Sequence, residues 1–113
     1  MEKRRVVITG LGAMTPLGNT VEDYWNNLVA GVSGAAPITL FDTKDFKTQF
    51  ACEVKNFNVE DFIDRKEARR MDKFAQYAVA ASEEAIKDAG ITADNVNKQR
   101  VGVIWGAGIG GLE

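Results

Sequence analysis

The clearest hydrophobic pattern along the chain is a pair of short apolar runs that predict buried β-strands. The first run occupies residues 5–9 and contains Val6, Val7 and Ile8, and the second occupies residues 101–105. The second run, VGVIW, is apolar throughout, as expected for a strand that is covered on both faces of a sheet. A weaker, alternating run at residues 50–54 predicts a third strand.

Apolar residues recur at helical spacing in the stretches between these runs. Residues 21–30 have one apolar face, and Thr20, with Asp23 three positions on, is placed to cap a helix that Gly31 ends. A short helix is predicted at residues 59–64, capped by Asn58. A long helix is predicted at residues 66–89 and ends at Gly90. Its core stripe would be Met71, Phe74, Ala78, Ala81, Ala85 and Ala89.

Strands that alternate with helices indicate an α/β fold, in which helices cover the faces of a largely parallel sheet. The pattern shows no internal domain boundary across residues 1–113. Two confident strands and a weaker third are few for such a sheet, and a Gly-rich loop follows the last of them. We therefore expect the sheet within this chain to be incomplete.

The glycines after the first strand invite two interpretations. Gly10 and Gly12 could begin a dinucleotide-binding loop, but Thr15 stands where that motif requires its third glycine. The following helix also begins too late to face a pyrophosphate held by these glycines. A structural role, in which glycine lets the backbone fold back tightly, is the favoured interpretation.

Composition limits the function classes. A net charge of −2 argues against nucleic acid as the main partner, and no 18-residue apolar run predicts a transmembrane span. The single cysteine excludes an internal disulfide and is typical of a reducing, cytoplasmic compartment. The chain has no histidine, so it lacks the commonest general base and a zinc-binding set, and no metal site is predicted.

No catalytic residue is predicted within the chain itself. Cys52 lies in an alternating, strand-like segment and not at a helix N-terminus that would stabilise a thiolate, so we interpret it as a packing residue. The carboxylates Glu83 and Glu84 are expected to face solvent.

A basic segment at residues 65–70 opens the predicted long helix, where the helix dipole disfavours cations. Lys66, Arg69 and Arg70 stand at i, i+3 and i+4 and would share one face. This face is either a solvated helix surface, whose positive charge Glu67 and Asp72 partly offset, or a binding surface for an acidic partner.

Three blocks of sequence carry a resemblance to a known family. The start, VVITGLGAMTPLGNTVEDYWNNLVAGVSG, resembles that of the β-ketoacyl-[acyl-carrier-protein] synthases, and LFDTKDFKTQFACEVKNFNVEDFIDRKEARRMDKFAQYAV resembles the type II elongating members. The end, VGVIWGAGIGGLE, resembles the family's strand followed by a G-x-G-I-G-G loop. The resemblance covers all 113 residues and implies a thiolase-like, layered α/β/α fold. Because members of the family are several times longer, it also implies that the chain is the N-terminal portion of a β-ketoacyl synthase N-terminal domain in a larger enzyme.

The resemblance also implies an activity and a set of roles. It implies an acyltransferase that condenses acyl and malonyl groups carried by acyl carrier protein, working as a homodimer without a separate cofactor. By resemblance, Lys66, Arg69 and Arg70 dock the carrier protein, and Ile109 gates the acyl pocket near the dimer interface. The family's nucleophilic cysteine and its two histidines match no position in this chain, so the chain alone is expected to be inactive.

Two alternatives of other classes remain open. The parent protein could be a polyketide-type or decarboxylating homologue, which only the segment with the nucleophile distinguishes. The chain could also be a non-catalytic module that binds a nucleotide or a carrier protein.

Overall fold

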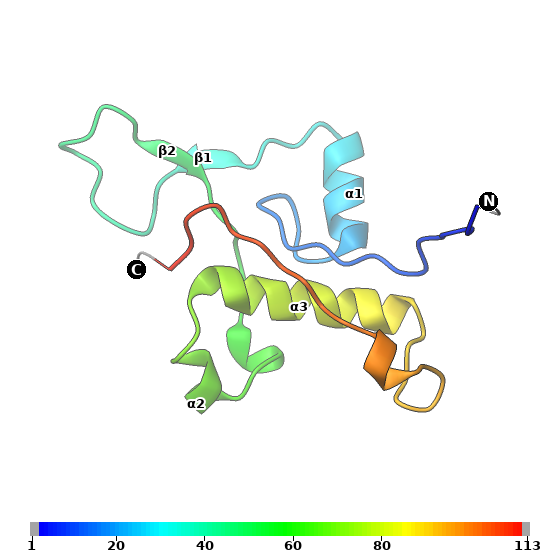
Figure 1. Cartoon of the computed structure of the whole chain (residues 1–113). Coiled ribbons are helices and arrows are strands. Elements are labelled where there is room, and N and C mark those ends of the chain that lie inside the picture. Colours follow the sequence, from blue (N-terminus) through cyan, green and yellow to red (C-terminus); the bar gives the residue numbers. More distant parts are fainter. Residues whose placement is uncertain (1–2, 112–113) are drawn as a thin grey trace.

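The structure is a computed structural model that describes residues 3–111. Helices and a small two-stranded sheet follow one another along the chain, joined by long irregular segments (Figure 1). The elements, in order, are α1 (Val21–Val29), β1 (Ala35–Pro37), β2 (Phe50–Cys52), the 3₁₀ turn η1 (Val59–Asp61), α2 (Arg65–Ala68), α3 (Lys73–Asp88) and the 3₁₀ turn η2 (Lys98–Arg100).

The sheet consists of β1 and β2, which pair antiparallel with Ala36 opposite Ala51. The predicted strand at residues 50–54 is confirmed at its first three positions, whereas its partner β1 was not predicted. A further backbone hydrogen bond from Ile38 to the carbonyl of Gln49 (3.0 Å) extends the pairing into the loop of residues 38–49.

The predictions of strands at residues 5–9 and 101–105 are wrong for the described part of the chain, where neither segment forms a strand. A strand requires a ladder of hydrogen bonds to a neighbour, and neither segment has one among residues 3–111. The chain over residues 101–111, orange to red in Figure 1, instead runs across α3. Val103 lies beside Ala78 and Ile86 in a hollow of about 400 Å³.

The local signals at the helix ends are confirmed. The Thr20 hydroxyl accepts a hydrogen bond from the backbone N–H of Asp23 (3.1 Å), and α1 then runs to Val29. The Asn58 side chain caps η1, although the predicted helix at residues 59–64 is only this 3₁₀ turn. Gly31 and Gly90 follow the ends of α1 and α3 with φ of 71° and 63°, values that favour glycine.

The predicted long helix at residues 66–89 is in fact two helices. The Asp64 carboxylate accepts a hydrogen bond from the N–H of Lys66 (2.8 Å) and begins α2, which ends at Ala68. Asp72 is extended, with φ −68° and ψ 158°, so the chain leaves helical geometry and restarts as α3 at Lys73. The Asp72 side chain makes no capping hydrogen bond, and its backbone carbonyl accepts the N–H groups of Ala75 (3.0 Å) and Gln76 (3.1 Å) at the start of α3.

The packing of α3 depends on small residues on both sides of a contact. Ala78, Ala80 and Ala81 are buried, and the backbone at Gly10 and Gly12 passes directly over the helix. A Cβ atom at Gly12 would collide with the carbonyl oxygen of Ala81, and one at Gly10 with that of Ala85. Neither glycine has a positive φ. Their structural role is therefore close approach to α3 and not a tight turn, and the space that a dinucleotide would need is filled by the helix.

Carboxylates of α3 hold the same segment in place. The Glu84 side chain accepts one hydrogen bond from the N–H of Ala13 (2.8 Å) and one from the N–H of Val21 (2.9 Å) at the start of α1. Asp88 accepts a third from the N–H of Leu11 (2.9 Å). The expectation that Glu84 faces solvent is therefore wrong, because this residue is half-buried. Its carboxylate also lies at the N-terminal end of α1, where the helix dipole is positive.

The core of the described residues is thin. The buried hydrophobic residues are Ile63, Ala68, Ala78, Ala80 and Ala81, so two members of the predicted stripe are buried, whereas Phe74 is 38% exposed. Large apolar side chains at both ends of the described chain lie open, among them Val6 at 88% and Ile104 at 98%. No helix in residues 3–111 has the length and hydrophobicity to cross a membrane.

We predict that Glu84→Ala destabilises the protein by about 2 kcal/mol, because two partly buried N–H groups lose a charged acceptor. Glu83→Ala is the matched control, since Glu83 is the exposed neighbour on the same helix. Urea unfolding of the purified variants measures the difference. Equal free energies of unfolding for the two variants would show that the Glu84 hydrogen bonds contribute nothing.

Candidate functional site

The basic segment of residues 65–70 lies on α2 and the turn that follows it, not at the start of a long helix. The sequence-based placement at the N-terminus of that helix is wrong, because α3 begins only at Lys73. Asp64 occupies the capping position before α2, Arg65 and Lys66 are the first two residues of this single turn, Arg69 is its C-cap, and Arg70 follows in the turn before α3. The four cations therefore do not lie in the first turn of the long helix, as the sequence-based placement required.

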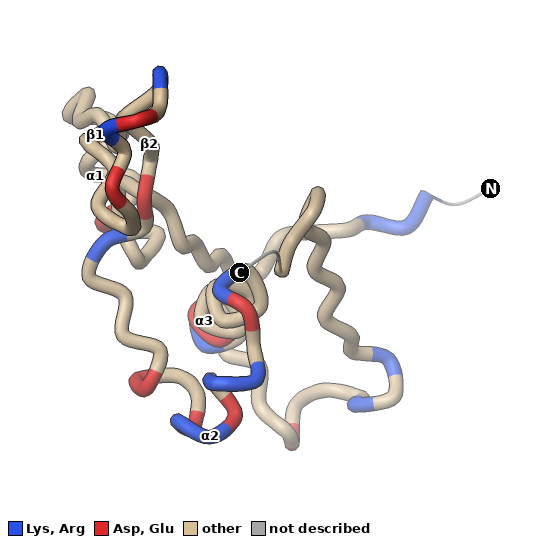
Figure 2. The backbone as a smooth tube through the Cα atoms, turned by 90° about the vertical axis from the view of Figure 1, so that its left-hand side faces the viewer, with Lys and Arg blue, Asp and Glu red and all other residues tan. Residues whose placement is uncertain are grey.

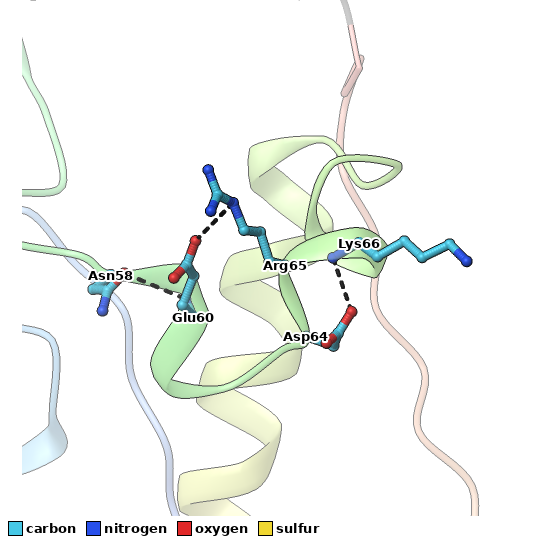
Figure 3. A network of polar contacts seen from close by, with 5 residues as sticks. All are labelled: Asn58, Glu60, Asp64, Arg65 and Lys66. Carbon is cyan, nitrogen blue, oxygen red and sulfur yellow. Dashed lines mark hydrogen bonds and ion pairs between the residues drawn. The ribbon is translucent and has the colours of Figure 1, made fainter.

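The cations of this segment have different surroundings. Arg65 forms an ion pair with Glu60 at 3.5 Å, and both side chains are more than half exposed (Figure 3). Such a surface pair contributes little to stability, but it partly neutralises Arg65. Lys66 extends away from this pair (Figure 3).

Lys66, Arg69 and Arg70 form the unneutralised part of the segment. All three are exposed, and among residues 3–111 no ion pair involves any of them. Arg69 keeps helical geometry as the C-cap of α2, so it retains the helical spacing from Lys66. Figure 2 shows the blue of this segment around α2 at one edge of the molecule, with the red of acidic residues between the basic ones. The three exposed cations are available to an acidic partner.

The Gly-rich loop of residues 106–111 ends against the start of α3. Gly110 and Gly111 have φ of 55° and 62°, a backbone conformation that glycine adopts readily. A Cβ atom at Gly110 would lie 3.0 Å from the ring of Phe74, and one at Gly111 would collide with the Asp72 carboxylate. The structure therefore brings this loop and the basic segment, which are far apart in the sequence, to the same end of α3 (Figure 1).

Ile109 projects from this loop and is 81% exposed. Its flanking backbone is fixed on one side by the contact of Gly110 with Phe74. An exposed isoleucine on a turn anchored to a helix is free to line a cavity that another part of a protein completes.

Cys52 lies in β2, exposed, at the edge of a hollow of about 670 Å³ beside the hairpin. In the same hollow, the Thr39 hydroxyl donates a hydrogen bond to Glu53 (2.8 Å), which holds the pKa of Glu53 below its ordinary value. A strand position offers no helix N-terminus to stabilise a thiolate, and that Cys52 is not a nucleophile stays a prediction. The interpretation of Cys52 as a packing residue is wrong, because the residue is exposed. Among residues 3–111, no three His, Cys, Asp or Glu side chains gather as a metal site.

One polar residue next to the basic segment was missed by sequence reasoning. The Gln76 side chain, from the second turn of α3, donates hydrogen bonds to the carbonyls of Ala68 (3.0 Å) and Met71 (2.9 Å). No spacing rule could mark it, because its partners belong to the preceding helix and turn, whose existence the pattern did not reveal.

Comparison with known proteins defines the class to which this arrangement belongs. Residues 3–113 match the family model of the β-ketoacyl synthase N-terminal domain, and the chain is a member of that family. It is 52% identical over 113 residues to 3-oxoacyl-[acyl-carrier-protein] synthase 2 of Synechocystis sp., covering 100% of this chain and 27% of the relative. It is 51% identical over 112 residues to the protein of that name from Staphylococcus aureus, covering 99% of this chain and 27% of the relative.

A solved structure supports the same assignment. The ishigamide ketosynthase/chain length factor matches with a TM-score of 0.77 and 45% identity, over 84% of this chain and 24% of that one. The expected α/β, thiolase-like fold and the resemblance to type II elongating synthases are thereby confirmed. The chain spans 27% of the length of the curated relatives that it matches.

Proposed function

We propose that this chain is part of a 3-oxoacyl-[acyl-carrier-protein] synthase of fatty acid elongation. The observation that carries the proposal is the identity of about half of all positions, along the entire chain, to synthases of that name. The enzyme transfers an acyl group from its carrier protein to a cysteine thiolate. Malonyl carrier protein then loses carbon dioxide, and the resulting carbanion attacks the acyl thioester and releases the cysteine. The products are 3-oxoacyl carrier protein and carbon dioxide.

The nucleophilic cysteine and the two histidines that stabilise developing negative charge belong to segments outside these 113 residues. The contribution of this chain is recognition. Lys66, Arg69 and Arg70 form the docking surface for the acidic acyl carrier protein, because they are exposed and none of them forms an ion pair with a described residue.

Ile109 acts as the gate of the acyl pocket. Its support is the loop geometry, in which an exposed apolar side chain precedes two positive-φ glycines that pass close to the start of α3, at the same end as the docking surface. The enzyme needs no separate cofactor, since its substrates arrive on the phosphopantetheine arm of the carrier protein. It acts in the cytoplasm as a homodimer.

A polyketide-type ketosynthase is the second candidate function. The 45% identity to the ishigamide ketosynthase/chain length factor favours it, because that likeness is nearly as strong as the likeness to the elongating synthases. The two candidates share the condensing chemistry and the carrier protein, and they differ in the fate of the 3-oxo product.

A condensation assay on the full-length gene product tests the proposal. The substrates are an acyl carrier protein loaded with a saturated acyl chain and malonyl carrier protein, and the readouts are 3-oxoacyl product and carbon dioxide. The 113-residue chain, run beside it, should give neither product. Carbon dioxide without 3-oxoacyl product would indicate a decarboxylating homologue, and neither product from a folded protein would indicate a binding module.

We predict that reversing the docking charges, by Lys66→Glu, Arg69→Glu and Arg70→Glu together, raises the KM for carrier-bound substrate by about tenfold or more, because repulsion replaces attraction to an acidic partner. Kinetics with a small acyl thioester that lacks the carrier protein should not change. The matched control reverses Lys98 and Arg100, which are exposed cations on η2. An equal rise in KM for both substrates would contradict a docking role.

We predict that Ile109→Phe shortens the longest acyl chain that the enzyme accepts, because the larger ring fills volume in the pocket. Product analysis by mass spectrometry over a series of acyl chain lengths measures the limit. Ile109→Leu conserves volume and should leave the limit where it is. If the phenylalanine variant has the wild-type limit, Ile109 does not line the pocket.

A further inference from the structure

The side chain of Gln76 connects α3 to the chain that carries the docking charges. Its Nε2 atom donates to the carbonyl of Ala68 at 3.0 Å and to the carbonyl of Met71 at 2.9 Å. An amide nitrogen carries two hydrogens, so one nitrogen can satisfy both oxygens at once. The side chain is half-buried, and Ala68 beneath it is 5% exposed. The contact is therefore sheltered from competition with water.

The two carbonyls bracket the two arginines of the docking surface. Ala68 immediately precedes Arg69, and Met71 immediately follows Arg70. Within the turn, the N–H of Arg69 donates to the carbonyl of Arg65 (3.3 Å) and the N–H of Arg70 to that of Glu67 (2.9 Å), so the Gln76 amide adds to local backbone hydrogen bonds. The N–H of Met71 donates to the carbonyl of Ala68 at 3.2 Å, and α2 itself is a four-residue helix. Helices this short are unstable without outside contacts. The Gln76 amide thus links α3, the longest helix among the described residues, to both ends of the Arg69–Arg70 turn.

We propose that Gln76 is a positioning residue for carrier-protein docking. It touches neither the partner nor the reacting atoms. It holds the backbone of Arg69 and Arg70 against α3, so that both guanidinium groups are presented together from a fixed turn. The proposal rests on the docking function of this segment. If the turn adopts the binding conformation for only a fraction of the time, its apparent affinity for the partner falls in proportion to that fraction. Loss of the Gln76 hydrogen bonds therefore weakens docking and leaves the chemical step unchanged.

The test substitutes Gln76→Met in the full-length enzyme, which keeps the shape of the side chain and removes both donors. Gln49→Met is the matched control, since Gln49 also donates its amide to a backbone carbonyl, that of Phe46 at 3.2 Å, but lies in the exposed loop between β1 and β2. The first readout is KM and kcat with carrier-bound substrate and with a small acyl thioester. The second is hydrogen exchange at the amides of Arg70 and Met71, which donate within this turn.

We expect Gln76→Met to raise the KM for carrier-bound substrate about threefold to tenfold, relative to Gln49→Met, with kcat and the small-thioester kinetics unchanged. Exchange at Arg70 and Met71 should become faster. Gln76→Lys, whose ammonium group can donate to the same two carbonyls, should restore slow exchange.

Two results would overturn the positioning role. In the first, reversal of Lys66, Arg69 and Arg70 raises the KM for carrier-bound substrate but Gln76→Met does not. Docking at this segment would then stand, and Gln76 would have no part in it. The other is an equal loss with both substrates, which assigns Gln76 to general folding. If charge reversal itself has no effect on the carrier-bound substrate, the docking proposal fails first, and the positioning role fails with it.

Discussion

The arrangement of the chain depends on the close approach of the Gly10–Gly12 backbone to the alanine face of α3. Only glycine fits there, because a Cβ atom at Gly12 would occupy the space of the Ala81 carbonyl. Glu84 then fixes this contact by accepting hydrogen bonds from Ala13 and Val21. A single side chain of α3 thereby sets the position of the first loop and the start of α1. The helix serves as the scaffold to which the other segments attach.

The opposite end of the same helix organises the candidate site. Gln76 braces the turn of Arg69 and Arg70, and Phe74 supports the glycines next to Ile109. The basic segment with Lys66, Arg69 and Arg70 and the loop with Ile109 therefore lie at one end of the same helix, although the sequence separates them widely (Figure 1).

Sequence reasoning succeeded where structure is decided locally. The caps at Thr20 and Asn58 and the stops at Gly31 and Gly90 act on neighbouring backbone groups, so spacing alone reveals them. It failed where the outcome depends on distant partners. Residues 5–9 and 101–105 have strand composition but no ladder among the described residues, and the apolar stripe concealed the break at Asp72. Glu84 and Gln76 read as ordinary surface residues, because their partners lie on other segments. The docking and gating residues came from family resemblance and not from pattern.

Hydrogen exchange of the full-length protein, with and without bound acyl carrier protein, tests the central claim that the braced basic turn is the docking surface. The amides of residues 65–71 should exchange more slowly in the complex, whereas those of the loop at residues 38–49 should not change. Carrier binding that leaves residues 65–71 unprotected and slows exchange elsewhere would contradict the account.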